Sequence, residues 1–449
     1  MRKLVLLGLA QVLFILAGCG GGSNGVVTSP SNNGSGGGGG NSSGNTLTIT
    51  VDSGPDPANG YDVDTPFITV TICAPGSTTN CQQIDHVEVD TGSYGLRVMS
   101  SVLNASLASA LQQEVGTGNN PIVECTQFAD GYSWGPIKLA DVQIAGESAS
   151  AVPIQVIGDP SFANEVPTAC SGTGTAENTV TAFGANAIIG IGVFVDDCGS
   201  GCASQANNGW YYTCPPNGTS TSCAQTTLSE SRQVTDPVAG FRTDNNGVVV
   251  ELPAATEGAS TATGTLIFGI GTASNNSLGS QTILMADSSY GDVTTTYTTQ
   301  GGQQMVLPYS YFDTGSNAYY FADDAIPSLQ SCSSYPGFNN TKPESWFCPA
   351  SELKLSATNT SAPSTGSGTQ STVSFSIGNA YTLFNSSPSG TVFDDLGASS
   401  GAQPTDCGSL STDTACAFDF GFPFFLGRNV YVAFAGANTA WGTGPYFAY

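Results

Sequence analysis

The tetrapeptide Asp-Thr-Gly-Ser occurs twice in the chain, each time directly after an apolar run. The first copy starts at Asp90 in "VEVDTGSYGLRV", and the second starts at Asp313 in "YFDTGSNAYYF". One copy alone would be typical of any surface turn, because Asp, Gly and Ser are common turn residues. Two copies, each placing a carboxylate at the end of an apolar strand, predict one site assembled from two halves.

Each copy is followed, much later in the chain, by two apolar residues and a glycine. These segments are Ile188-Ile189-Gly190 in the first half and Phe425-Leu426-Gly427 in the second half. A carboxylate turn and a distant glycine segment, repeated in the same order, indicate an internal duplication of long period.

Strand patterns dominate the chain. Short apolar or alternating runs are bounded by Gly, Pro and Asn, and the runs expected to be strands include 47–51, 67–73, 84–90, 141–146, 151–158, 264–271, 372–378, 424–427 and 430–434. The best helical window is 101–114, where three leucines recur on one face. The sequence therefore predicts an all-β fold.

The N-terminus has the pattern of an exported lipoprotein. Residues 1–18 carry two basic residues and then an apolar stretch that is too short to span a membrane, which is typical of a signal peptide. Leu16-Ala17-Gly18-Cys19 resembles a bacterial lipobox, which implies a lipid on Cys19; the alternative is an ordinary signal with a chance cysteine. Gly20 after Cys19 implies, by the same resemblance, the outer membrane.

Residues 19–45 are almost all Gly, Ser and Asn after the cysteine, so we expect a flexible tether. The chain also has 34 acidic and only 9 basic residues, for a formal net charge of −25. This charge disfavours nucleic acid and anionic lipid surfaces as partners.

Cysteine usage agrees with an oxidising compartment. Thirteen cysteines are present, and an even number remains once Cys19 is set apart. The spacings allow, without fixing, six local bridges: Cys73–Cys81, Cys125–Cys170, Cys198–Cys202, Cys214–Cys223, Cys332–Cys348 and Cys407–Cys416. No paired CxxC is present and His86 is the only histidine, so we expect no metal site.

His86 also bears on sites that use a histidine base. It lies four residues before Asp90 on the same predicted strand, which would place the two side chains on one face but about 13 Å apart. We expect His86 to be a half-buried strand residue rather than part of a Ser-His-Asp or Cys-His site.

The order of these features resembles the pepsin-like aspartic peptidases over most of residues 46–449. "FADGYSWG" (128–135) resembles the flap hairpin of that family, and "FFLGRNVYVAF" resembles its late segment. The resemblance implies a bilobal pepsin-like fold of two related β-barrel-like lobes, 46–240 and 241–449, with a cleft between them.

The resemblance makes Asp90 and Asp313 a catalytic pair. Two neighbouring carboxylates cannot both ionise cheaply, so they share one proton and can activate a water molecule for attack on a peptide carbonyl. By the same resemblance, Gly92 and Gly315 let the backbone come close to the carboxylates. Thr91 and Thr314 brace the two turns against each other, and Ser93 and Ser316 donate hydrogen bonds to the outer carboxylate oxygens.

The flap-like segment departs from the family pattern. Phe128 stands where the family has a tyrosine, and it cannot donate a hydroxyl hydrogen bond. Asp130, Gly131 and Tyr132 belong to the same segment, and Tyr132 either supplies the missing hydroxyl or packs on the hairpin. Arg97 stands where the family has a tryptophan, and it either faces solvent or pairs with a flap carboxylate such as Asp130.

The predicted function is that of a monomeric aspartic endopeptidase with an acidic pH optimum, acting on a peptide or protein substrate without a cofactor. The predicted location is the bacterial cell envelope, with the lipid on Cys19 as the membrane anchor. The alternative is a catalytically weak or silent pepsin-like protein that binds a peptide or protein in the cleft. A glycosidase would also use two carboxylates, but it does not fit the strand–turn context.

Overall fold

The computed structural model describes residues 44–58, 62–215, 217–298, 304–322, 329–335, 345–400 and 416–449. The predicted signal, Cys19 and nearly all of the predicted tether lie outside this part of the chain, and so does Cys407. The described residues contain no helix with the length and apolar character needed to cross a membrane. The structure is mostly β, which confirms the fold class at this level, and its α-helices have only four to seven residues.

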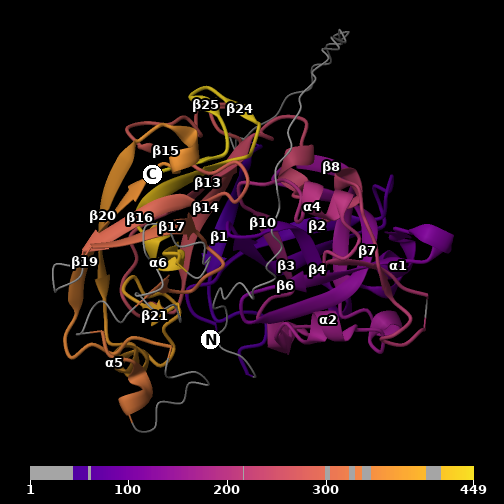
Figure 1. Ribbon diagram of the computed structural model, residues 1–449, viewed down its shortest axis with the longest axis horizontal. Helices are drawn as coiled ribbons and strands as arrows, with labels where there is room; N and C mark the ends of the chain where they lie inside the picture. Colours follow the sequence, from indigo (N-terminus) through magenta and orange to yellow (C-terminus); the bar gives the residue numbers. More distant parts are fainter. Residues whose placement is uncertain are drawn as a thin grey trace.

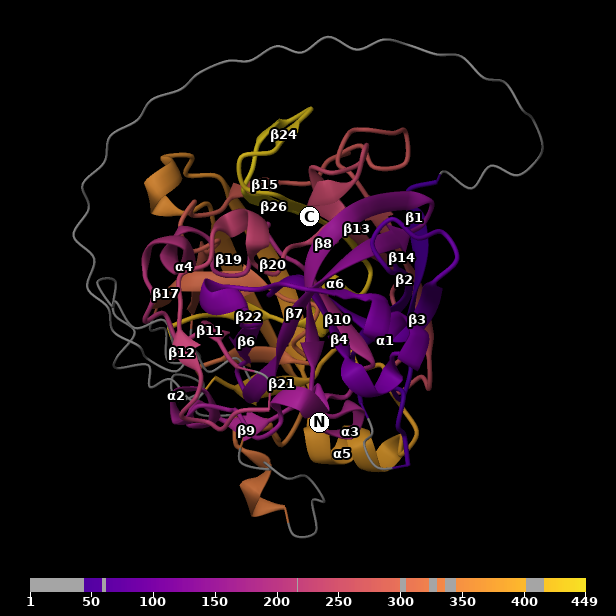
Figure 2. The same cartoon turned by 90° about the vertical axis from the view of Figure 1, so that its right-hand side faces the viewer.

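Strands from the first half of the chain form one group, which lies on the right in Figure 1 and in front in Figure 2. They are β2 (Pro66–Cys73), β3 (Cys81–Asp90), β4 (Tyr94–Met99), β5 (Gln112–Gln113), β6 (Ile122–Gln127), β7 (Gly131–Ile144), β8 (Glu147–Ile157), β9 (Thr175–Ala176), β10 (Ala187–Ile191), β11 (Tyr211–Thr213) and β12 (Ala224–Gln225). The short helices among them are α1 (Ala105–Ala110), α2 (Thr168–Ser171), α3 (Val180–Phe183) and α4 (Ser200–Ser204).

A second group belongs to the second half and lies on the left in Figure 1. It is a seven-stranded sheet in the order β20-β19-β16-β17-β22-β18-β21. The strands are β16 (Val293–Thr298), β17 (Gln304–Phe312), β18 (Tyr319–Phe321), β19 (Leu353–Thr360), β20 (Gln370–Ile377), β21 (Gly397–Ser399) and β22 (Asp419–Phe420), accompanied by α5 (Ala380–Ser386) and α6 (Phe422–Phe425).

Six strands, from both ends and from the middle of the described chain, form a sheet that joins the two groups. They pair in the order β1-β14-β13-β23-β26-β15. Their bounds are β1 (Thr46–Val51), β13 (Gly247–Leu252), β14 (Ala262–Phe268), β15 (Ile283–Met285), β23 (Arg428–Ala433) and β26 (Tyr446–Ala448), and a small hairpin, β24 (Asn438–Thr439) and β25 (Gly442–Thr443), precedes the last of them. The result is a bilobal arrangement of sheets.

Seven 3₁₀ turns complete the described elements. They are η1 (Ser100–Val102), η2 (Thr117–Asn119), η3 (Pro160–Phe162), η4 (Glu230–Arg232), η5 (Pro237–Gly240), η6 (Cys332–Ser334) and η7 (Pro363–Thr365).

The same strand crossing occurs once in each half. In the first half, β10 lies between β3, to which it is parallel, and β4, to which it is antiparallel. In the second half, β22 lies in the same way between β17 and β18. Because each crossing follows an Asp-Thr-Gly-Ser turn, the duplication seen in the sequence is also a duplication of local topology.

The predicted second glycine segment is wrong. Residues 424–427 are not a strand, since Phe422–Phe425 form α6; the glycine equivalent to Gly190 is Gly421, which directly follows β22. A Cβ on Gly421 would lie 2.1 Å from the carbonyl oxygen of Ala318, just as a Cβ on Gly190 would lie 2.3 Å from the amide nitrogen of Tyr94. Pro423 fits the first turn of a helix, where no amide donor is needed, and a short apolar run does not distinguish helix from strand.

The predicted helix over 101–114 is also shorter than expected. Asn104 caps α1 by accepting a hydrogen bond from the Leu107 amide, and the helix ends after six residues, before β5. The leucines at 103, 107 and 111 are all buried, so the apolar face exists although the continuous helix does not.

Five of the six allowed disulfides are present: Cys73–Cys81, Cys125–Cys170, Cys198–Cys202, Cys214–Cys223 and Cys332–Cys348. The sixth pair includes Cys407, which lies outside the described residues.

Candidate active site

Asp90 and Asp313 occupy equivalent places in the two halves. Asp90 is the last residue of β3, and Asp313 directly follows β17. In each turn the carboxylate accepts a hydrogen bond from the amide two residues on: Gly92 N donates to Asp90 Oδ1 at 2.7 Å, and Gly315 N donates to Asp313 Oδ1 at 2.7 Å. This local bond closes a turn on the Asp side chain and ends the strand.

The serine of each turn holds the other carboxylate oxygen. Ser93 Oγ donates to Asp90 Oδ2 at 2.5 Å, and Ser316 Oγ donates to Asp313 Oδ2 at 2.8 Å. Each carboxyl is therefore fixed at both oxygens by its own turn, which orients the two groups in the same way.

The two threonines connect the turns to each other. Thr91 Oγ1 donates to the carbonyl of Phe312 at 2.8 Å and accepts from the amide of Thr314 at 3.0 Å. Reciprocally, Thr314 Oγ1 donates to the carbonyl of Val89 at 2.6 Å and accepts from the amide of Thr91 at 3.1 Å. Four buried hydrogen bonds thus fix one turn against the other.

The glycines bring each turn against the opposite carboxyl. A Cβ on Gly92 would lie 2.5 Å from the carboxyl carbon of Asp313, and a Cβ on Gly315 would lie 2.7 Å from that of Asp90. Any other residue at either position would collide with the carboxyl across the site, so this approach requires glycine.

The carboxyls are almost fully buried, but the first turn reaches solvent. The exposed fractions of Asp90 and Asp313 are 5% and 4%, whereas Gly92 is exposed. The pKa of Asp313 is raised well above its ordinary value, first by burial and then by the charges of Asp90 and Asp419, together with a hydrogen bond to Asp90. The geometry therefore favours a proton on Asp313.

Asp419 is a third carboxyl at this site, which the sequence analysis missed. It lies on β22 and pairs with Tyr311, which precedes Asp313 by two residues. Because side chains alternate along a strand, Asp419 therefore points to the same side of the sheet as Asp313. It is 2% exposed, and neither carboxylate oxygen has a hydrogen-bond partner among the described residues. Burial raises its pKa well above the ordinary value, the nearby Ser316 hydroxyl lowers it, and the charge of Asp90 raises it further. The signal was a charged residue inside the apolar run "AFDFGF".

Asp292, just before β16, is a further acid near the pair. Burial and then the charge of Asp287 raise its pKa to about 8. Burial raises the pKa of the Tyr94 hydroxyl first, and the charges of Asp292, Asp90 and Asp313 then raise it further. No feature of the sequence pointed to this residue.

The predicted flap segment is a hairpin formed by β6 and β7. Phe128 closes the turn by donating its amide to the carbonyl of Gly131 at 2.8 Å, and its ring packs edge-on against Phe183 at 5.5 Å. Tyr132 is buried with Trp134 and the Cys125–Cys170 disulfide. Of the two roles expected for Tyr132, the structure therefore shows packing on the hairpin.

Asp130 lies at the tip of this hairpin. One of its carboxylate oxygens is buried without a hydrogen-bond partner among the described residues. Burial and the charge of Asp419 raise the pKa of Tyr320, in the second half, and the charges of Asp130 and Asp313 raise it further. Asp130 thus links the hairpin electrostatically to the half that carries Asp313.

The tip of the hairpin is held by a third strand. Gly131 and Tyr132 pair with β9, and a Cβ on Gly131 would lie 2.3 Å from the carbonyl oxygen of Thr175. The Cys125–Cys170 disulfide ties the same hairpin to α2. The hairpin is therefore anchored to the first half at its tip as well as at its base.

Both roles expected for Arg97 are wrong. Its side chain is 1% exposed and makes ion pairs with Glu124 at 2.8 Å and with Asp197 at 2.9 Å, not with Asp130. It also donates to Thr126 Oγ1 at 2.9 Å. A buried guanidinium needs such partners, and these lie 27 and 100 residues away from it in the sequence, where no local pattern reveals them.

His86 is a half-buried strand residue, as predicted. Its ring contacts Asp52 at 3.4 Å and Asp85 at 3.2 Å, and the side chain is 26% exposed. These contacts place it outside the Asp90–Asp313 site.

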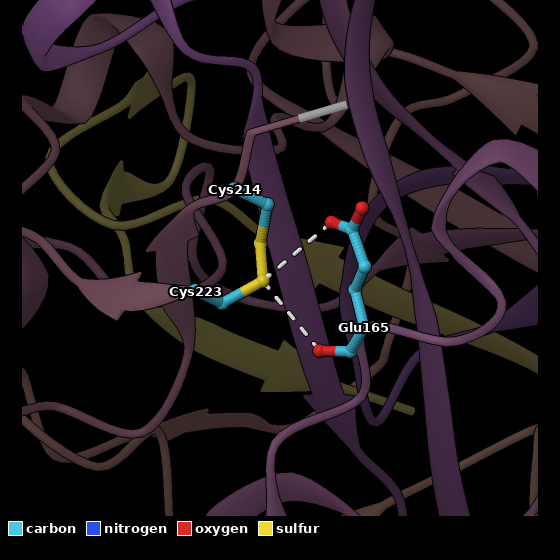
Figure 3. Close-up of side chains that lie close together, drawn as sticks. All are labelled: Glu165, Cys214 and Cys223. Carbon is cyan, nitrogen blue, oxygen red and sulfur yellow. Dashed lines mark hydrogen bonds between the residues drawn. A yellow bond between two sulfur atoms is a disulfide. The ribbon is translucent and has the colours of Figure 1, made fainter. Parts of the chain in front are cut away.

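One group of acid and cysteine side chains could suggest a metal site. Figure 3 shows that Cys214 and Cys223 are joined by a disulfide, with Glu165 against the Cys223 sulfur. The Glu165 carboxylate instead accepts a hydrogen bond from the amide of Gly218. Because disulfide sulfurs carry no thiolate, this group does not provide a thiolate metal site.

Comparisons with known proteins give a family for the chain. The solved structure of an aspartic proteinase from Irpex lacteus matches with 14% sequence identity, 90% of this chain and 96% of that chain covered, and a TM-score of 0.45. Among curated proteins, none matches. The profile of the family described as "Protein of unknown function (DUF3443)" matches residues 41–449, so the chain belongs to that family.

Proposed function

We propose that this protein is an aspartic endopeptidase with a pepsin-like fold. The observation that carries the proposal is the pair of equivalent turns, in which each carboxyl is held by an amide and a serine hydroxyl. The reciprocal threonine bonds support a fixed spacing between the two carboxyls. Such prior orientation is what an acid–base pair needs in order to act on one water molecule.

In the proposed reaction Asp313 carries the shared proton and Asp90 is the base. Asp90 takes a proton from a water molecule as its oxygen attacks the peptide carbonyl carbon, while Asp313 gives its proton to the carbonyl oxygen. The carbon–nitrogen bond then breaks, and the amine leaves with the proton that Asp90 received. The diol returns a hydroxyl proton to Asp313, so the pair is restored. The raised pKa of Asp313 supports this division of roles.

The substrate in this proposal is an extended peptide or a protein segment. It would bind in a cleft between two lobes, residues 46–240 and 241–449, and reach the carboxyls beside the exposed Gly92. Since one carboxyl of the pair must stay protonated, activity should have an acidic optimum and disappear at alkaline pH. No cofactor is required.

The test is cleavage of an unbiased peptide pool between pH 3 and 8. We expect cleavage by the unsubstituted protein and a loss of at least about a thousandfold in both Asp90→Asn and Asp313→Asn, because either change removes one half of the acid–base pair. Asp85→Asn is the matched control, since that side chain is 70% exposed and contacts His86 instead. Cleavage that persists in both active-site variants would refute the proposal.

A catalytically silent peptide-binding protein is the second candidate. It is favoured by Phe128, which has no hydroxyl, and by the anchoring of the hairpin tip to β9. A folded, disulfide-bonded protein that binds a pepstatin-type inhibitor but cleaves nothing would support this candidate.

We also propose that the protein is a monomer anchored by a lipid on Cys19 to the bacterial outer membrane, in the cell envelope. Cys19→Ala should prevent incorporation of a labelled fatty acid and release the protein from the membrane fraction. Retention of the label in that variant would contradict the proposal.

A further inference from the structure

Three acidic side chains from two loops, one between β13 and β14 and one between α5 and β21, lie together. Each of Glu257, Asp394 and Asp395 offers a carboxylate oxygen, and these three oxygens all lie within 4.8 Å of one another. Glu257 Oε2 also accepts a hydrogen bond from the amide of Asp394 at 3.3 Å, which keeps the two chain segments in contact. Such crowding of like charges costs free energy unless a cation or protons compensate it.

A fourth acid, Asp64, is buried beside this group. It is fully buried; Oδ1 accepts from the amide of Phe393 at 2.8 Å, and Oδ2 has no hydrogen-bond partner among the described residues. Burial raises the pKa of Asp64 and that hydrogen bond lowers it. The charges of Glu257, Asp395 and Asp394 raise it further. Its unsatisfied oxygen therefore belongs to the same electrostatic environment.

Asp395 has an unsatisfied oxygen as well. Its Oδ1 is buried without a hydrogen-bond partner among the described residues. Its other oxygen, Oδ2, would lie only 2.1 Å from a Cβ on Gly378, so the carboxyl has room only because that residue is glycine. Two orphaned buried oxygens in one acidic group are unusual, because buried polar atoms are normally satisfied.

No basic side chain compensates this charge within the described part of the chain. The ion pairs formed there involve other acids, namely Asp52, Asp85, Glu114, Glu124, Asp159 and Asp197. Protons are one means of compensation, since burial and a hydrogen bond to Asp394 raise the pKa of Glu257 to about 8; a cation bound from solution is the other.

We propose that Glu257, Asp394 and Asp395 bind a Ca²⁺ ion, with Asp64 as the buried acid behind it. Calcium takes oxygen ligands at about 2.3–2.6 Å, so two ligands of one ion are separated by at most about 5 Å, and three oxygens that all lie within 4.8 Å of one another satisfy this limit. Magnesium binds at about 2.1 Å and requires a nearly ideal octahedron, whereas calcium accepts irregular sets of carboxylate oxygens, so calcium suits ligands from separate loops better.

The ion would connect parts of the chain that are remote in sequence. Asp64 lies between β1 and β2, Glu257 between β13 and β14, and the two adjacent aspartates between α5 and β21. The segments already touch through backbone bonds from Asp64 N to Thr391 O and from Gly258 N to Val392 O, both 2.8 Å. Calcium binding should therefore stabilise the attachment of the N-terminal segment to the second half.

The test is calorimetric titration of the purified protein with CaCl₂ after treatment with EDTA. We expect one Ca²⁺ per chain and a melting temperature that rises with Ca²⁺ concentration. Glu257→Gln combined with Asp394→Asn should weaken binding by at least about tenfold, because two charged ligands become neutral. In EDTA this variant should melt no lower than the unsubstituted protein, since the changes relieve repulsion, so a folding defect is distinguishable from lost binding.

Glu230→Gln, which neutralises an exposed acid elsewhere, is the matched control and should bind Ca²⁺ normally. The absence of calcium-dependent heat and melting shift would overturn the proposal. So would equal binding by the double variant, or an equal shift with Mg²⁺ at the same ionic strength, because that would indicate charge screening.

Discussion

At the scale of single residues, the site contains more carboxyls than a shared-proton pair requires. Asp419 occupies the place on β22 that Ile188 occupies on β10, since each lies two residues before the crossing glycine. Ile188 packs in a hydrophobic cluster, whereas Asp419 is buried without a hydrogen-bond partner among the described residues. Because the charge of Asp419 is one of the causes that raise the pKa of Asp313, an acid at this position acts on the protonation of the neighbouring pair.

We predict that Asp419→Asn moves the alkaline limb of the cleavage profile to lower pH by roughly one unit. After burial and the charge of Asp90, the charge of Asp419 is a further cause that raises the pKa of Asp313, so removing that charge should lower the pKa of Asp313. The measurement is the pH dependence of kcat/KM, with Asp85→Asn as the control.

An unchanged alkaline limb would show that Asp419 does not act on the pair. Independently of activity, Asp419→Ile should raise the free energy of unfolding at neutral pH by about 1–3 kcal/mol, because it replaces an unsatisfied buried acid by an apolar side chain.

At the scale of secondary-structure elements, the strand crossings position the two turns. Gly190 lies opposite Asp90 in the parallel ladder of β3 and β10. In the second half the amide of Asp313 donates to the carbonyl of Phe420 at 3.0 Å, directly before Gly421. Each carboxylate turn is therefore held by a strand that arrives about a hundred residues later.

We predict that Gly421→Ala is far more damaging than Gly427→Ala. The added methyl group at 421 would lie 2.1 and 2.5 Å from the carbonyl oxygens of Ala318 and Ser316, so the backbone of the turn must shift, at a cost of about 2–3 kcal/mol. At 427 the nearest atom would be 3.6 Å away, and only the positive φ of 76° opposes alanine, at about 1 kcal/mol.

Urea unfolding of the two variants measures this difference, and peptide cleavage reports whether the turn has moved. Equal destabilisation by the two substitutions would contradict the equivalence of Gly421 and Gly190.

The sequence predicted most of the strands and both turns, because alternation and Gly-rich breaks are local signals. It failed for residues 424–427, since a short apolar run with Pro423 fits a helix start as well as a strand. It failed for Arg97 because the carboxylates that pair with it come from distant segments. Asp419 was visible as a charge in an apolar run, but only the register with Tyr311 places it near Asp313.

At the scale of the whole molecule, buried acids govern the dependence of stability on pH. Burial raises the pKa of Asp236, Asp313 and Asp419 well above the ordinary value, and it is the main cause that raises that of Asp292 to about 8. Below the ordinary pKa near 4 these groups are protonated in both the folded and the unfolded state. As the pH rises through the folded-state values, the folded state holds protons that the unfolded state has lost, and stability falls.

We therefore predict that, in EDTA, the melting temperature falls steadily from pH 5 to pH 8. The growing repulsion within a chain of formal charge −25 acts in the same direction. The double variant Asp236→Asn, Asp419→Asn should show a shallower fall, because two of the responsible groups no longer titrate. Differential scanning calorimetry at several pH values measures this, and a melting temperature that rises across this range would refute it.

The reciprocal threonine hydrogen bonds determine when the carboxyl pair forms during folding. Val89 and Phe312 receive their side-chain hydrogen bonds from the turn of the opposite half, so neither turn is complete until both halves have folded and met. If the chain is exported N-terminus first, as the proposed lipid anchor on Cys19 requires, Asp90 crosses the membrane before Asp313. During that interval no pair of carboxyls exists, so the proposed hydrolase would stay inactive until both halves have folded together.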